Sequence, residues 1–193
     1  RFKYMADGLF DRMQAGNEHP ISFPIALTTA IINEFRTTGI SQIGVNAIIA
    51  YPYDGIHTCC VFEANLQPRL LDEHHYYVAL GSGKQSADPF LRFLVDIFCQ
   101  EGQPNVREAI FLSTWVVQHV IDTNPGGVAG PIRISVLENG GDSFSSREIS
   151  DGEIEQHQEA IASARESLVS WREEISGESE EDISVPPDAP HTS

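Results

Sequence analysis

The sequence lacks the features that mark nucleic-acid-binding and membrane-spanning proteins. It has only two lysines, Lys3 and Lys84, and no basic cluster, so it offers no positive surface to phosphates or anionic membranes. No apolar run approaches the roughly 20 residues that a membrane-spanning helix requires. No basic, apolar-centred signal peptide opens the chain. These absences predict a cytoplasmic protein with no nucleic-acid or membrane partner.

Cysteine is also scarce, and its spacing predicts neither disulfides nor a metal site. Adjacent Cys59 and Cys60 would point to opposite faces of a strand, and Cys99 leaves an odd count. There is no CxxC or HExxH element, and the neighbouring His74 and His75 cannot easily share one ion. We therefore expect reduced thiols, no metal and no cofactor.

The formal net charge of −16 is concentrated at the C-terminal end of the chain. Residues 138–193 hold 15 of the 28 acidic residues and 3 of the 12 basic ones. Residues 1–137 are close to ordinary in charge. The acidity is therefore a property of the tail, and it carries no inference about chemistry.

Four helices are predicted from apolar residues at helical spacing, in two pairs. The first covers residues 2–15, and the second is capped by Ser22 and ends at Gly39. In the second pair, Asp88 is the expected cap, with Pro89 at the first helical position.

Asn105 and Glu108 form a capping-box variant that opens the fourth helix. Strands are expected between and after the helix pairs, at residues 44–50, 57–64, 76–80 and 131–137, with a turn at 51–55. Strands clustered between helix pairs favour an α+β fold, in which helices cover an antiparallel sheet. Four strands cannot readily cover four helices, so we expect further strands before Arg1.

The composition divides the chain into a domain and a C-terminal extension. Residues 1–138 form the expected domain, and 139–150 read as a Gly/Ser linker. Residues 151–176 repeat apolar side chains every seven positions, which predicts one amphipathic helix. Residues 177–193 are acidic and Ser/Pro-rich, which predicts a disordered tail.

Two glycine-containing motifs carry a resemblance to a known family. Gly81-Ser82-Gly83, at a predicted strand end before a helix, resembles the GSG element of proteasome β subunits and their bacterial relatives. The loop 122–127 (DTNPGG) looks like the D-x-x-S-G-G segment of the same family. The order of elements over residues 1–137 is similar too, apart from the family's opening strands. The resemblance implies a four-layer αββα N-terminal nucleophile (Ntn) hydrolase sandwich.

The resemblance also implies a chemistry and an assembly. Family members are threonine-type peptidases that act on peptide or protein substrates in homo-oligomeric rings or spirals, and their nucleophile is the first residue of the mature chain. Ser82 would correspond to the serine that hydrogen-bonds the terminal amine, and Asp122 to the aspartate that orients it. Gly81 and Gly83 would let the backbone of the site wall approach closely.

The sequence departs from the family at two points. Arg1 cannot be the nucleophile, so the nucleophile and its partner lysine are expected upstream of it. Pro125 stands where the family usually has a serine. Two alternatives to a peptidase therefore remain: a non-catalytic structural subunit of a similar assembly, and a related amidase that acts on small amides.

Overall fold

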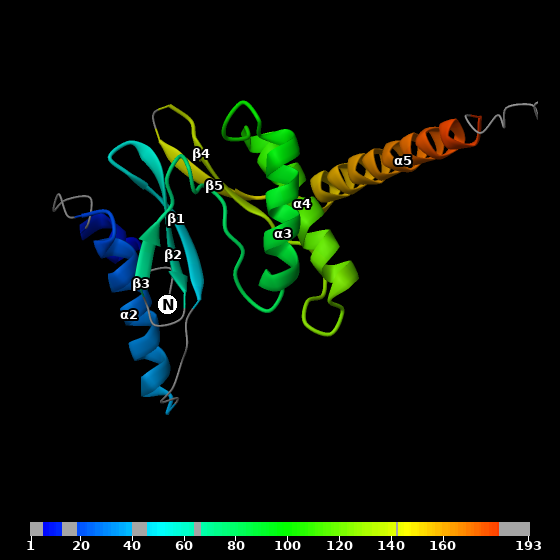
Figure 1. Ribbon diagram of the computed structural model, residues 1–193. Helices are drawn as coiled ribbons and strands as arrows, with labels where there is room; N and C mark the ends of the chain where they lie inside the picture. Colours follow the sequence, from blue (N-terminus) through cyan, green and yellow to red (C-terminus); the bar gives the residue numbers. More distant parts are fainter. Residues whose placement is uncertain (1–5, 13–18, 40–45, 64–66, 142, 182–193) are drawn as a thin grey trace, which may run out of the picture. The chain divides into compact units, whose positions relative to one another are not determined.

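The computed structural model describes residues 6–12, 19–39, 46–63, 67–141 and 143–181. They belong to two compact units, residues 1–149 and 150–193. Helices and two small antiparallel sheets confirm the α+β class (Figure 1). The described residues show no four-layer sandwich, so that finer expectation stays a proposal.

A three-stranded antiparallel sheet in the order β1-β2-β3 is built on one tight hairpin. Strands β1 (Ala47–Tyr53) and β2 (Ile56–Glu63) pair throughout their length, up to Tyr53 opposite Ile56. The turn is therefore only Asp54-Gly55, with φ values of 49° and 74°. Asp-Gly suits this turn because both central residues need a positive φ. The predicted turn at 51–55 was too long.

The third strand is not the predicted one. Residues 76–80 form no strand, although all five side chains are half-buried. These residues are aromatic and aliphatic because they are partly buried. The same residue types are common in strands for the same reason, so composition alone predicted a strand here. The third strand is instead β3 (Gln67–Leu70), with Pro68 opposite Phe62. A proline is tolerated there because β3 lies at the edge of the sheet.

One face of this sheet is covered by helix α2 (Ser22–Thr37) and by the helical residues 6–12 (Figure 1). The core between them contains Phe23, Tyr51, Cys60 and Phe62. The rings of Phe23 and Tyr51 lie 5.2 Å apart. Burial raises the pKa of Tyr51, so its hydroxyl stays protonated and donates to the Pro20 carbonyl.

The ends of α2 differ in part from the prediction. Ser22 is the first helical residue and not the cap, because Ile21 precedes the helix in a helical conformation without a side-chain cap bond. Gly39, with φ 85°, follows the helix end as predicted. Of the predicted helix 2–15, residues 6–12 are helical, and the remainder lies outside the described residues.

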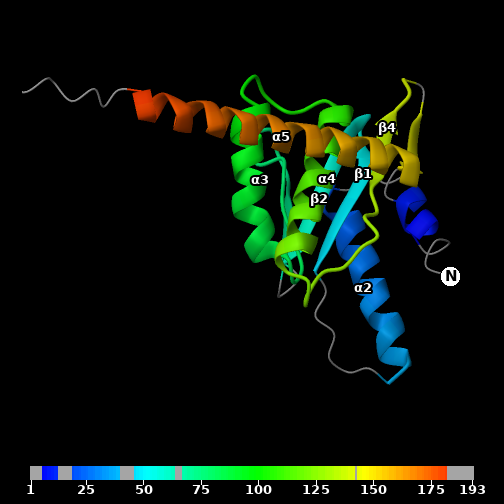
Figure 2. The same ribbon diagram turned by 90° about the vertical axis from the view of Figure 1, so that its right-hand side faces the viewer.

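Helices α3 (Lys84–Phe98) and α4 (Val106–Thr123) pack against each other (Figure 2). The predicted capping box of α4 is confirmed: the Glu108 N–H donates to Asn105 Oδ1 at 3.0 Å, and the Asn105 N–H donates to Glu108 Oε2 at 2.9 Å. The predicted cap Asp88 is wrong. Helix α3 begins at Lys84, so Pro89 lies inside it.

The earlier start of α3 has a local cause. The N–H groups of Ser86 and Ala87 both donate to the Gly83 carbonyl, and the Lys84 N–H donates to Gly81. These bonds build the first turn from residues that read as a glycine-rich loop. Helix formation therefore begins before the proline that suggested the later boundary.

A second hairpin joins β4 (Ser135–Asn139) to β5 (Phe144–Glu148), with Leu137 opposite Ser146. Only the last residues of the predicted strand 131–137 are in β4. Strand β5 lies within the range 139–150 that reads as a linker. Its residues are mostly exposed and polar, so they lack the apolar alternation that marks a half-buried strand.

In the second unit, the described residues from Asp151 to Glu181 form helix α5. Ser150 caps it: its hydroxyl accepts from the Glu153 N–H at 3.2 Å, and Glu153 Oε2 accepts from the Ser150 N–H at 3.2 Å. Residues 182–193 of the predicted tail lie outside the described residues. Among the described helices, none combines the length and the apolar composition that a membrane span requires.

Candidate functional site

The two glycine-containing motifs, more than 40 residues apart in sequence, lie side by side. The Ser82 hydroxyl, in the turn before α3, donates to the Gly127 carbonyl at 2.9 Å. The Asn124 side-chain amide, in the loop after α4, approaches the Ser82 carbonyl at 3.5 Å. The turn and the loop are thus connected in both directions. We call this pair of segments the serine turn (residues 81–83) and the glycine loop (residues 124–128).

Gly81 and Gly83 serve the serine turn in different ways. Gly81 has a φ of 91°, a conformation that residues with a Cβ rarely adopt. Gly83 has an ordinary φ of −85° but no room for a side chain. A Cβ at Gly83 would lie 2.5 Å from Val120 Cγ1 and 3.2 Å from Val128 Cγ2. Gly83 therefore packs against α4 and the glycine loop, and the expected role of the two glycines in a site wall stays a prediction.

Asp122 is in the last turn of α4 and is exposed. Its Oδ1 accepts a hydrogen bond of 2.8 Å from the Gln118 side-chain amide, one turn earlier on the same helix. The structure thus places Asp122 two residues before the glycine loop that Ser82 contacts. Its expected role in orienting Ser82 stays a prediction.

The glycine loop is a compact turn around Pro125. The N–H groups of Gly127 and Val128 both donate to the Asn124 carbonyl, at 3.0 and 3.1 Å. Pro125 is exposed and contributes neither a hydroxyl nor an N–H. The loop therefore presents the Gly127 carbonyl to Ser82. Asn124 and Gly127 were not predicted as site residues. Their place in the same motif as Asp122 is the sequence feature that could have indicated them.

Lys84 follows the serine turn directly, but its ammonium group is held by carboxylates. Lys84 Nζ donates to Glu63 Oε1 at the end of β2 and lies 3.8 Å from Asp88 Oδ2. The hydrogen bond to Glu63 raises the pKa of Lys84, and Lys84 in turn lowers the pKa of Glu63. Lys84 is therefore protonated at neutral pH and cannot act as a base toward the Ser82 hydroxyl.

No family model, curated protein or solved structure matches this chain. Any functional conclusion must therefore rest on the residues and geometry of the chain itself.

The described residues contain no group of three or more His, Cys, Asp or Glu side chains that could hold a metal ion. His74 and His75 are exposed, and their backbone N–H groups donate to Asp72 Oδ1 at 2.9 and 2.7 Å. These bonds, the one from His75 above all, lower the pKa of Asp72. The histidine pair is thus part of an Asp-initiated turn.

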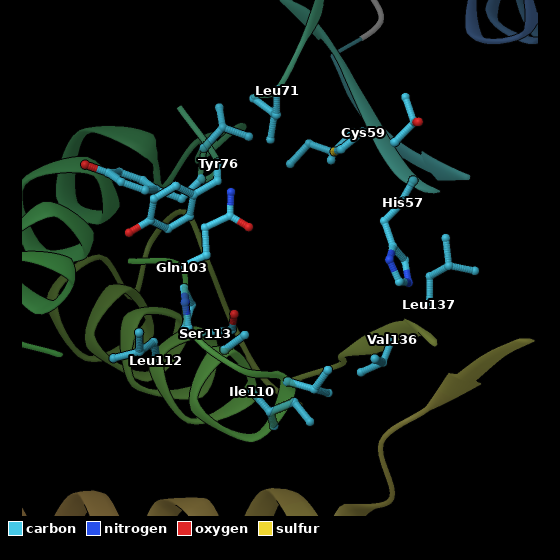
Figure 3. Close-up of a pocket in the computed structure, with 18 of the residues that line it drawn as sticks. His57, Cys59, Leu71, Tyr76, Gln103, Ile110, Leu112, Ser113, Val136 and Leu137 are labelled. Atoms are coloured by element: carbon cyan, nitrogen blue, oxygen red, sulfur yellow. The ribbon is translucent and has the colours of Figure 1, made fainter. Parts of the chain in front are cut away.

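A cavity of about 800 Å³ lies elsewhere in the first unit (Figure 3). Its walls come from β1 and β2, residues 71–78, α3 and α4, and residues 134–137, and most of its surface is apolar. Ser82 and Asp122 are not among the described residues that line it. The labelled side chains of His57, Cys59 and Tyr76 supply polar atoms in its walls (Figure 3).

The thiol of Cys59 and the phenol of Tyr76 in the walls of this cavity both have a raised pKa. Burial, followed by the neighbouring Cys60, raises the pKa of Cys59, so the thiol is not the reactive thiolate. Burial also raises the pKa of Tyr76, followed by the nearby Cys99. The cavity is therefore a mostly apolar space whose polar lining includes the carboxylates of Asp72 and Glu73. The Cys59 thiol in its wall is not an activated nucleophile.

Proposed function

We propose that this chain is part of a proteasome-like Ntn hydrolase subunit, a threonine-type peptidase in which the serine turn and the glycine loop support the catalytic nucleophile. The proposal assigns Ser82 a hydrogen bond to a terminal amine and Asp122 an orienting role. It assigns no nucleophile to residues 1–193. The nucleophile and its lysine would come from further sequence of the same protein.

The observation that carries this proposal is the hydrogen bond from Ser82 to the Gly127 carbonyl. A GSG turn alone is a common sequence element and weak evidence of function. A GSG turn bonded to a second glycine-rich loop beside an aspartate is a more specific arrangement. It places a hydroxyl, several backbone groups and the end of α4 in one small region.

The open edges of the sheets support the finer fold proposal. Strand β1 has one sheet neighbour, β2, and β4 has one, β5, among the described strands. The side chains of Ile48 and Ile56 on the first sheet are 48% and 64% exposed. An exposed apolar side chain on an open edge strand, such as Ile48 on β1, is unusual in a finished sheet. Further strands from the same protein would cover them and complete a four-layer sandwich.

The test is covalent labelling of the protein expressed from its complete reading frame. A hydroxyl-directed peptide inhibitor should modify one residue at the mature N-terminus, identified by mass spectrometry of the intact protein and its fragments. Ser82→Ala and Asp122→Asn should each slow this labelling. Ser167→Ala is the matched control, because Ser167 is also exposed and its hydroxyl also donates to a backbone carbonyl, that of Ser163 at 3.0 Å.

Absence of labelling in a well-folded, oligomeric protein would reject the peptidase proposal. It would favour the alternative of a non-catalytic structural subunit, to which Pro125 points because it removes the family's loop hydroxyl. Labelling combined with hydrolysis of small amides and no cleavage of peptides would favour an amidase. A peptidase of this class would also be expected to form a homo-oligomeric ring or spiral.

A further inference from the structure

Helix α3 exposes apolar side chains to solvent next to one positive and one negative side chain. Phe93 and Ile97, one turn apart, are 53% and 48% exposed, and Phe98 is 44% exposed. Arg92 and Asp96, also one turn apart, are exposed on the same side of the helix. By helical spacing, the two charges line one edge of this face, and Phe93 and Ile97 line the other. We call these four residues the α3 face.

We propose that the α3 face is the contact between two copies of this chain, paired as antiparallel helices about a two-fold axis. This inference concerns assembly alone and does not depend on the proposed peptidase function.

The order of residues on α3 fits this symmetry. A two-fold axis outside the α3 face, at the level of residue 94 along the helix, brings residue 92 of each copy opposite residue 96 of the other. Arg92 then meets Asp96 twice, once on each side of the axis. The same operation places residue 93 of each copy opposite residue 95 of the other, so the two Phe93 side chains lie one residue to either side of the axis. A second copy of this chain carries the matching positive and negative side chains at the required spacing, whereas a partner of unrelated sequence need not.

The aromatic side chains below this face hold Phe93 in place. The Phe93 ring stacks on Phe90, with centroids 6.2 Å apart and planes at 21°. Phe90 in turn stacks on His119 at 4.1 Å and meets the edge of Trp115 at 6.0 Å. A large aromatic side chain fixed before binding loses little conformational freedom on association. Phe93 is therefore suited to be the central anchor.

Charge also argues for a specific pairing over loose association. The chain carries a formal net charge of −16, so two copies repel each other at long range. Opposite charges within the contact offset this repulsion locally. The reciprocal Arg92 to Asp96 pairs supply such charges when the two helices run antiparallel.

The test is sedimentation of the full chain over a wide concentration range, with charge reversals. The wild type should form dimers, or larger assemblies that contain this contact. Arg92→Asp and Asp96→Arg should each raise the dissociation constant about tenfold or more, because both symmetric pairs become like-charged. Arg36→Asp on α2, with the same change in net charge at another exposed site, should leave it nearly unchanged.

Mixing the two single variants provides the decisive result. An Arg92→Asp chain and an Asp96→Arg chain restore both opposite-charge pairs in the mixed dimer, so the mixture should associate more tightly than either variant alone. A change in helix stability within one chain cannot produce this rescue, and circular dichroism would check that each variant is folded. A monomeric wild type, an effect of Arg36→Asp equal to that of Arg92→Asp, or a mixture no tighter than its components would each overturn the proposal.

Discussion

Replacing Gly83 by alanine gives the sharpest test of how the serine turn packs. The new Cβ would lie 2.5 Å from Val120 Cγ1, a distance that real Cβ atoms do not tolerate, and 3.2 Å from Val128 Cγ2. Val120 is buried, with 5% of its surface exposed, so it cannot rotate freely out of the way. The backbone at Gly83, with φ −85° and ψ −2°, is itself open to alanine. Any destabilisation therefore comes from the side-chain clash.

The expected loss is about 1–2 kcal/mol. Overpacking of this kind costs about 1–3 kcal/mol. The lower entropy of the unfolded alanine chain offsets about 0.4–1 kcal/mol of that loss. For a protein of this size the net effect lowers the melting temperature by about 2–8 °C. Urea denaturation followed by circular dichroism would measure it, with an unchanged slope showing that the folded state is intact.

A double mutant tests the cause. Val120→Ala removes the methyl group that would clash, so Gly83→Ala should cost less in the Val120→Ala background, by about 1 kcal/mol or more. Gly126→Ala is the control in the glycine loop, because a Cβ there meets nothing within 4 Å. The reasoning fails if Gly83→Ala is as stable as Gly126→Ala, or if the effects of the two substitutions simply add.

Two further predictions concern the elements beside the candidate site. Asn105→Ala removes the side-chain acceptor of the α4 capping box and should lower stability by about 1 kcal/mol, measured by urea denaturation; Asn105→Asp should retain most of it. Lys84→Met should remove a contribution that depends on pH in a defined way. Lys84 holds the folded pKa of Glu63 down, so that contribution is complete above the unfolded pKa of Glu63 and fades as pH falls through the folded value. Glu63 raises the folded pKa of Lys84, so the contribution also fades as pH rises through that value. The stability difference between wild type and Lys84→Met should be flat between about pH 6 and pH 9 and shrink on both sides; a difference independent of pH from acid to alkali would contradict the ion pair.

The sequence predicted features whose cause is local. The capping box of Asn105 and Glu108 depends on side chains three residues apart, and the Asp54-Gly55 turn depends on backbone preferences of two residues. Both are present in the structure. The α+β class followed from the order of helices and strands along the chain. That order can be predicted without knowing any tertiary contact.

The sequence failed where tertiary contacts decide the outcome. Residues 76–80 have the composition of a strand, yet they are half-buried without pairing. Pro68 lies within strand β3, where the edge position tolerates a proline. Helix α3 starts early because the Gly83 carbonyl accepts hydrogen bonds from its first turn. Pro89 suggested a later start, because proline is common at the first position of a helix. At the candidate site, Ser82 and Asp122 were chosen by motif. The hydrogen bond from Ser82 to Gly127 could not be predicted, because it joins residues 45 positions apart in the sequence.

The pairing of neighbours has a consequence for how the chain folds. Strands β1, β2 and β3 pair in sequence order, β4 pairs with β5, and α3 packs with α4. Each of these contacts closes a short loop, which costs little chain entropy and forms quickly. Contacts such as the one between Ser82 and Gly127 close much longer loops and should form late. We expect the hairpins and the helix pair to appear before the transition state and the serine turn to lock after it, so a substitution at Gly83 should speed unfolding more than it slows folding.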